Sequence, residues 1–204
     1  MSHRSLLVRA LPAVGFAGGL AFVFLGCSSV SGGTSVRSAA EGAAAAQGEG
    51  AGHPLVGKPA PAFSAEWIMG EGPKTLAEAR GKVVIVDFWA TYCDPCKKLF
   101  PKYQELVKQF GGEIAVIAIS IDEKGDSQEE AKSTKEAIQK FVKNAGVTFP
   151  IVWDIDQTAV NTYNPPKMPT SYLIDKAGIV RSVHAGYRGA DEAMIVEEIK
   201  ALLR

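Results

Sequence analysis

The chain has 204 residues, with 22 Lys+Arg against 22 Asp+Glu, 47% hydrophobic residues and three cysteines. This length suits one domain of ordinary size plus additional segments, and the zero formal charge argues against a nucleic-acid binder, which needs a basic face. Three cysteines exclude a small fold stapled by disulfides, and an odd number means that they are not all paired within the chain.

Residues 1–26 have the features of a secretory signal. Arg4 and Arg9 precede an uncharged stretch from Ala10 to Gly26. Its apolar part is shorter than the roughly 20 apolar residues that a membrane-spanning helix needs, which favours a cleaved signal. An uncleaved N-terminal membrane anchor is the alternative. Phe24–Cys27 resembles the bacterial lipobox, except that leucine is usual where Phe24 stands. The resemblance implies that Cys27 receives lipid, and both interpretations place the folded part outside the cytoplasm.

Residues 27–53 consist mainly of Ser, Gly, Ala and Thr. They contain too few apolar side chains to offset the conformational entropy lost on folding, which predicts a flexible tether. The folded domain is therefore expected at residues 54–204.

Strand and helix patterns alternate after Pro54. Short β-branched and aromatic runs predict strands, and apolar residues at steps of three and four predict helices. The strands are expected at 83–89, 114–121, 149–153, 171–174 and 179–185, and the helices at 95–110, 129–144, 158–163 and 190–203. Pro101 should kink the first helix. This order predicts an α/β fold, in which helices cover both faces of a mixed sheet.

Cys93-Asp94-Pro95-Cys96 follows the first predicted strand and opens the first predicted helix. The spacing of three residues puts both sulfurs on one helix face, with Cα atoms close enough to bridge. Free N–H groups and the helix dipole favour a thiolate at the helix N-terminus, which activates Cys93 as a nucleophile. Cys96 lies one turn further in and should react second.

Two other uses of this motif fit the sequence less well. A zinc site needs two more ligands, and His53 and His184 do not form a ligand-like pair. A purely structural disulfide would close a very small loop and therefore constrain little of the unfolded chain.

Residues 84–97, with this motif at their end, resemble the active-site stretch of thioredoxin-fold proteins, and Met168-Pro169-Thr170 resembles their cis-proline signature. The opening residues 56–63 and the extra helix between the motifs are similar to the TlpA/ResA group of membrane-anchored thiol–disulfide oxidoreductases. The resemblance covers about three quarters of the chain. It implies a thioredoxin-like fold with an N-terminal extension and a central helical insertion.

The resemblance also implies roles for individual residues. Cys93 would attack, Cys96 would resolve, and the two would form a disulfide in the oxidised state. Pro169 would be a cis-proline facing this disulfide, with the Met168 backbone pairing with an extended substrate. The other expected substrate contacts are Trp89, Tyr92, Pro95 and Thr170.

Two acidic residues are expected to act in catalysis. Asp87, six residues before Cys93, matches the buried acid of thioredoxin and would take the Cys96 proton, with a solvent-facing aspartate as the alternative. Glu123 lines up less closely with an acid near the active site of ResA-like proteins, and a plain turn residue is the alternative.

The sequence departs from the TlpA/ResA pattern at Tyr92, where the group usually has tryptophan. Asp94 stands where thioredoxin has glycine. A carboxylate beside Cys93 should oppose the thiolate and raise its pKa, which favours a reducing dithiol.

Other classes on this fold fit less well. A peroxiredoxin needs Thr and Pro where this chain has Ala90 and Val86. A Sco-like copper chaperone spaces its cysteines CxxxC with a partnering histidine, and a redox-inert binding module would not need both cysteines and the cis-proline.

The sequence therefore predicts an envelope thiol–disulfide oxidoreductase without metal, flavin or nucleotide cofactor. Its partners would be disulfide-bearing envelope proteins, apocytochrome c among them. A membrane electron donor would supply the electrons, and a lipid on Cys27 would attach the protein to a membrane on its periplasmic side.

Overall fold

The computed structural model describes residues 52–204. The predicted signal at 1–26, the lipidation site Cys27 and nearly all of the predicted tether at 27–53 lie outside the described residues. His53, at the end of that tether, contacts Tyr172 edge-to-face, with ring centroids 5.3 Å apart. Within residues 52–204 no helix is both long enough and apolar enough to cross a membrane.

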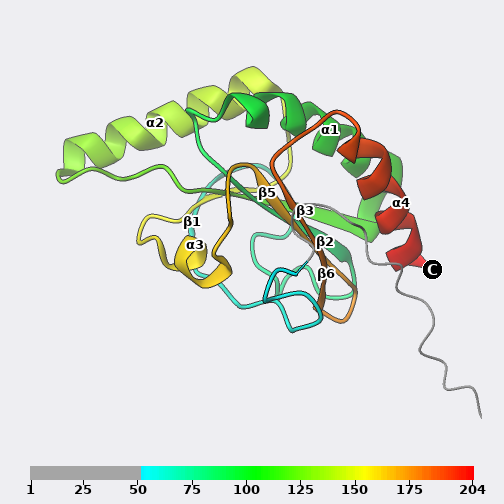
Figure 1. The fold of residues 1–204 in the computed structure, drawn as a ribbon. Helices are drawn as coiled ribbons and strands as arrows, with labels where there is room; N and C mark the ends of the chain where they lie inside the picture. Colours follow the sequence, from blue (N-terminus) through cyan, green and yellow to red (C-terminus); the bar gives the residue numbers. More distant parts are fainter. Residues whose placement is uncertain (1–51) are drawn as a thin grey trace, which may run out of the picture. The chain divides into compact units, whose positions relative to one another are not determined.

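A six-stranded mixed sheet forms the centre of the fold (Figure 1). Its spatial order is β1-β4-β3-β2-β5-β6, with β2, β3 and β4 parallel and the other pairings antiparallel. The strands are β1 Glu66–Met69, β2 Val83–Trp89, β3 Ile114–Ser120, β4 Ile151–Trp153, β5 Thr170–Ile174 and β6 Val180–Ala185. Five match predicted strands to within two residues, and β1 was not predicted.

Between residues 52 and 204, four α-helices accompany the sheet: α1 Asp94–Phe110, α2 Gln128–Ala145, α3 Thr158–Tyr163 and α4 Asp191–Leu203. Each begins and ends within one residue of its prediction. Pro101 lies inside α1, which continues past it to Phe110. The mixed sheet with helices on both faces confirms the predicted fold class.

Alternation along β2 divides the core into two layers, because successive strand side chains point to opposite faces. Ile85 and Trp89 join the apolar cluster that includes residues of α1, α2 and α4. Val84 and Phe88 join the cluster that includes α3 and the segment before β1. By the same alternation, Asp87 lies on the face of Ile85 and Trp89, beneath α1.

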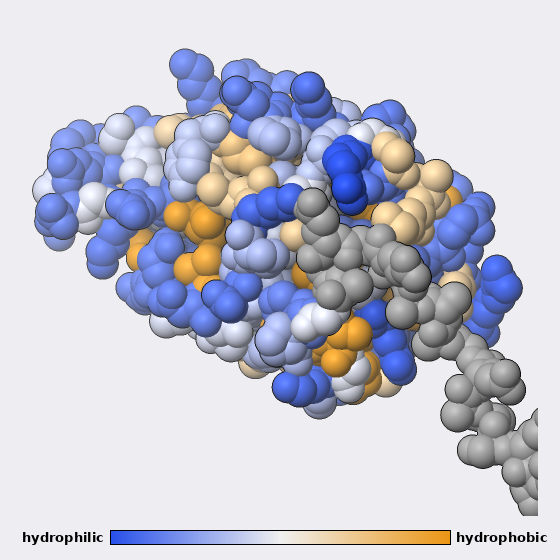
Figure 2. Space-filling view, viewed as in Figure 1, coloured by the Kyte–Doolittle hydropathy of each residue, from blue (hydrophilic) through white to orange (hydrophobic). Residues whose placement is uncertain are grey.

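The inserted helix α2 has well-defined ends. Ser127 and Glu130 form a capping box at its start, and Gly146 ends it with a left-handed backbone (φ 65°). Its apolar side faces the sheet through Ile138 and Val142, and its outer surface is mainly hydrophilic (Figure 2).

Candidate active site

A disulfide joins Cys93 and Cys96, whose Cα atoms are 5.4 Å apart. Cys93 is the N-cap of α1, and its Sγ accepts a hydrogen bond from the Cys96 backbone N–H at 3.3 Å. Cys93 is 6% exposed and Cys96 is fully buried. The sulfur of Cys93 is therefore both the more accessible one and the one that the helix N-terminus would stabilise as a thiolate.

Asp122 anchors the loop that precedes the disulfide. Its carboxylate accepts hydrogen bonds from the Thr91 backbone N–H (3.1 and 3.2 Å) and from Thr91 Oγ1 (2.5 Å), and Ser120 Oγ donates to it at 2.7 Å. Asp122 is buried and lies two residues after the last residue of β3. It thereby ties the cysteine loop to the end of the neighbouring strand. Sequence reasoning missed this residue and singled out Glu123, next to it.

Glu123 is exposed, and its backbone carbonyl accepts a hydrogen bond from Thr134 Oγ1 at 3.0 Å. The pKa of the Tyr92 hydroxyl is raised, chiefly by burial and then by the negative charges of Asp122 and Glu123. The structure thus places the charge of Glu123 near Tyr92, on the outer side of the site.

Asp94 is exposed beside Cys93, and its carboxylate forms a 2.5 Å ion pair with Lys97. The hydrogen bond and the charge of Lys97 hold the pKa of Asp94 below its usual value. The lysine offsets part of the negative charge that the sequence placed next to the attacking sulfur.

The Met168–Pro169 peptide bond is cis, at the start of β5. The Pro169 carbonyl accepts a hydrogen bond from the Gly186 N–H at 2.7 Å, which fixes the loop against the end of β6. Met168 is half-buried and packs against the apolar cluster that contains both cysteines. The proline loop and the disulfide therefore border the same core cluster.

The side chains of two of the expected substrate contacts lie in the interior of the fold. Trp89 and Thr170 are fully buried. Trp89 lies between Phe100 of α1 and Phe141 of α2, with ring centroids 4.8 and 4.7 Å away, and Thr170 Oγ1 donates to the Lys167 carbonyl. Both side chains support the site from inside the fold. Tyr92, 67% exposed, and the exposed Pro95 stay candidates for contact with a partner.

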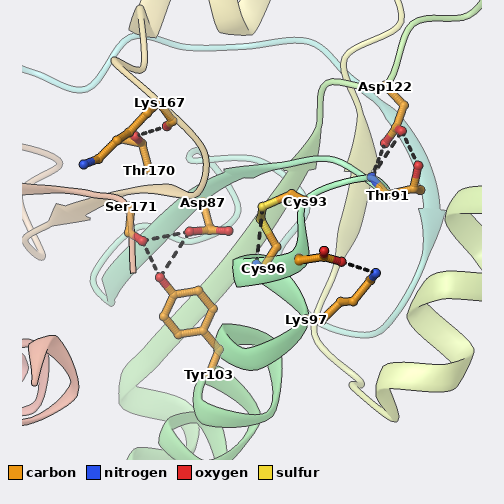
Figure 3. Close-up of a disulfide and its surroundings, with 11 residues drawn as sticks. Asp87, Thr91, Cys93, Cys96, Lys97, Tyr103, Asp122, Lys167, Thr170 and Ser171 are labelled. Carbon is orange, nitrogen blue, oxygen red and sulfur yellow. Dashed lines mark hydrogen bonds and ion pairs between the residues drawn. A yellow bond between two sulfur atoms is a disulfide. The ribbon is translucent and has the colours of Figure 1, made fainter. Parts of the chain in front are cut away.

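Asp87 is fully buried at the centre of the sheet. Ser171 Oγ donates to its Oδ1 at 2.7 Å, Tyr103 Oη donates to the same oxygen at 3.2 Å, and Oδ2 has no partner. Figure 3 shows Oδ1 facing the two hydroxyls and the other carboxylate oxygen pointing toward the disulfide. Burial raises the pKa of Asp87 to about 7, against a smaller lowering by the two hydrogen bonds. This places Asp87 in the range where a carboxylate exchanges protons at neutral pH.

Metal-ligating side chains do not gather in the described part of the chain: residues 52–204 contain no group of three His, Cys, Asp or Glu residues placed to hold a metal ion. His184, one of the two histidines considered as ligands, is instead within 2.8 Å of the Glu198 carboxylate through its Nε2.

Comparison with known proteins agrees with this geometry. A model of the AhpC/TSA family matches residues 56–183. Two Bacillus subtilis proteins are similar over 131 residues, or 64% of this chain: thioredoxin-like protein YneN (33% identical, 71% of its length covered) and thiol-disulfide oxidoreductase ResA (34% identical, 67% covered).

The fold is also similar to the crystal structure of a thiol:disulfide interchange protein of the thioredoxin family from Chlorobium tepidum TLS. That match has a TM-score of 0.57 and 27% identity, and it covers 72% of this chain and 96% of the other. Fold, dithiol and relatives agree, and we conclude that the chain belongs to the AhpC/TSA family of thioredoxin-like proteins, as one of its thiol–disulfide oxidoreductases.

Proposed function

We propose that the protein reduces disulfides of partner proteins in the bacterial cell envelope. The observation that carries this proposal is the asymmetry of the dithiol. Cys93 caps α1 and keeps a small exposed fraction, whereas Cys96 is fully buried behind it, on the side of the sheet where Asp87 lies. One sulfur is thus placed to meet a partner and the other to release it.

In the first step, the Cys93 thiolate attacks one sulfur of the partner disulfide. A new S–S bond forms between Cys93 and the partner, and the partner's own S–S bond breaks. Its second sulfur leaves with the electron pair and takes a proton. The Cys96 N–H, which points at Cys93 Sγ, stabilises the negative sulfur before the attack.

In the second step, Cys96 must lose its proton before it can attack the mixed disulfide. Asp87 accepts this proton, directly or through one water, on the oxygen that has no partner. The Cys96 thiolate then attacks Cys93 Sγ and the Cys93–partner bond breaks. The partner's sulfur leaves with the electron pair and takes a proton from Asp87 or from solvent. The protein ends as the Cys93–Cys96 disulfide and has transferred two electrons.

The reducing direction rests on the negative charges near the dithiol. Asp87 is buried with only neutral hydroxyl partners among the described residues, and Asp94 adjoins Cys93, although Lys97 offsets part of its charge. Negative charge opposes thiolate formation, and a dithiol with destabilised thiolates gives up its electrons more readily.

The surface around Cys93 would receive the partner as an extended segment. Tyr92 and Pro95 are exposed on the cysteine side, and Met168 borders the site on the cis-proline side. An apocytochrome c with its haem-binding cysteines is one partner of the required chemistry.

The envelope location rests on the sequence of residues 1–27. A signal ending at Gly26 and a lipid on Cys27 would hold the domain at a membrane on its periplasmic side, with an uncleaved N-terminal helix as the alternative. Outside the cytoplasm, a membrane electron donor would have to regenerate the dithiol.

Trapping tests this proposal. Cys96→Ser removes the resolving sulfur, so mixed disulfides through Cys93 should accumulate in cells and disappear on treatment with a reductant. Non-reducing electrophoresis and mass spectrometry would identify the partners. Cys93→Ser is the matched control and should trap none. Equal adducts in both variants, or none with Cys96→Ser, would contradict the proposal.

A further inference from the structure

The two hydroxyls around Asp87 come from elements far apart in the sequence. Ser171 lies on β5 directly opposite Asp87 in the antiparallel pair with β2. Tyr103 lies on α1, two turns after Cys96, so both residues are on the face of the helix that covers the sheet. The same helix therefore carries the resolving cysteine and one of the hydrogen-bond donors to the buried acid (Figure 3).

Both donors serve one oxygen only. Ser171 and Tyr103 contact Oδ1 and also each other, and Oδ2 has no partner. The two hydroxyl hydrogens thus take part in hydrogen bonds inside this three-residue cluster, and neither is donated to Oδ2. A proton taken up by Asp87 consequently has its place on Oδ2, the oxygen that points toward the disulfide.

Hydrogen bonds to a carboxylate favour its ionised form, whereas burial disfavours it. In this cluster burial has the larger effect on the pKa of Asp87, and the two hydroxyls limit the rise. Without them, more of the Asp87 population would carry a proton at neutral pH and could not accept one from Cys96.

Other ionisable groups lie near this cluster. Burial first, then the charge of Asp87 and, to a smaller extent, that of Tyr187 raise the pKa of the Tyr103 hydroxyl. Tyr187 precedes α4. Across β5 from Asp87, His184 of β6 is the strand partner of Ser171 and is paired with Glu198 of α4. On the other side of Asp87, its β3 partner is Ala118.

We propose that Tyr103 and Ser171 are positioning residues for proton transfer between Cys96 and Asp87. They bind Oδ1, direct Oδ2 at the sulfur, and keep the carboxylate ionised when the resolving step needs a base. The proton moves from Cys96 Sγ to Asp87 Oδ2, and the electron pair stays on the sulfur that attacks Cys93. This inference rests on the proposed function and assigns the residues that tune its second step.

Reaction of the reduced protein with 5,5′-dithiobis(2-nitrobenzoate) separates the two steps. Attack by Cys93 releases one coloured thiolate, and resolution by Cys96 releases the second. Ser171→Ala and Tyr103→Phe should keep a first phase that releases one equivalent of coloured thiolate. Both should move the midpoint of the second phase's pH profile upward, by about one unit for each hydroxyl lost.

Tyr172→Phe is the matched control. Tyr172 is also fully buried and neighbours Ser171, but its hydroxyl donates to the Tyr163 carbonyl on the other face of the sheet. It should leave the midpoint where it is in the wild type. Ser171→Thr, which keeps a hydroxyl, should restore most of the shift seen with Ser171→Ala.

Adding Ser171→Ala to Asp87→Asn should change the second phase no further, because the hydroxyl acts through the carboxylate. An unshifted midpoint in both hydroxyl variants, or the same shift in Tyr172→Phe, would overturn the inference. If Tyr103→Phe does not fold, the pH midpoint of the second phase in Ser171→Ala alone tests the inference. Absence of the first phase in the wild type would instead contradict the proposed function.

Discussion

Asp87 bears on both the proposed chemistry and the stability of this fold. Its carboxyl is fully buried, and burial raises its pKa from 3.8 to about 7. A buried acid with a raised pKa destabilises the fold when it is ionised, so stability should fall as pH rises from about 4 to 7 and stay level above that range.

Asp87→Asn should therefore stabilise the oxidised protein at pH 8 and lose this advantage at pH 4. Three pKa units correspond to roughly 4 kcal/mol as an upper limit. Urea unfolding across this pH range measures the difference from wild type, with the exposed Asp156→Asn as control. A gain in stability that does not depend on pH would contradict the assignment of the raised pKa to Asp87.

The residues that carry the chemistry were partly predictable. The cysteines, Asp87 and Pro169 belong to short motifs, and the structure places Cys93 at a helix N-terminus, Asp87 in the interior and Pro169 after a cis bond. Asp122 was missed because its contact with Thr91 joins residues 31 positions apart. Periodicity and motif spacing carry no signal for such a pairing.

Two of the expected substrate contacts, Trp89 and Thr170, have buried side chains. Trp89 lies beside the cysteine motif in the sequence and Thr170 lies beside the cis-proline. Successive side chains along a strand point to opposite faces of the sheet. Because helices cover both faces of this sheet, a strand side chain is buried whichever face it points to. Closeness to a motif therefore did not predict exposure.

Among the elements, α2 supports the site from a distance. Phe141 of α2 contacts Trp89 and Phe100, with ring centroids 4.7 and 5.7 Å away, and Trp89 belongs to the cluster that holds both cysteines. An aromatic contact of this kind joins the inserted helix to the strand and helix on either side of the disulfide.

Phe141→Ala should lower the free energy of unfolding by about 2–3 kcal/mol, because it opens a cavity against Trp89. Guanidinium unfolding followed by far-UV circular dichroism measures the loss. Lys143→Ala, on the exposed surface of the same helix, should stay within about 0.5 kcal/mol of wild type. Similar losses in both variants would mean that α2 does not support the site through this contact.

The strand β1 is the one strand of the sheet that was not predicted from the sequence. It is four residues long, lies at the sheet edge, and pairs with β4 more than 80 residues later. A short edge strand has little alternation of its own, and a distant partner decides its pairing. The longer β2, β3 and α1 were predicted because their apolar patterns span seven residues or more.

At the scale of the whole molecule, the sheet brings two distant segments to one place: β2 with the start of α1, and β5. Figure 3 shows residues of β2, the start of α1 and β5 around the disulfide. The sequence separates these segments by as many as 84 positions, the distance between Asp87 and Ser171. We propose that this assembly makes a reducing dithiol.

The reduction potential of the Cys93–Cys96 pair tests that claim most directly. Residues 52–204 would be equilibrated with dithiothreitol buffers of known poise at pH 7, and the thiols counted by alkylation and intact mass. The predicted value lies near that of thioredoxin, about −270 mV. A value near about −120 mV, typical of the strong oxidant DsbA, would contradict the account.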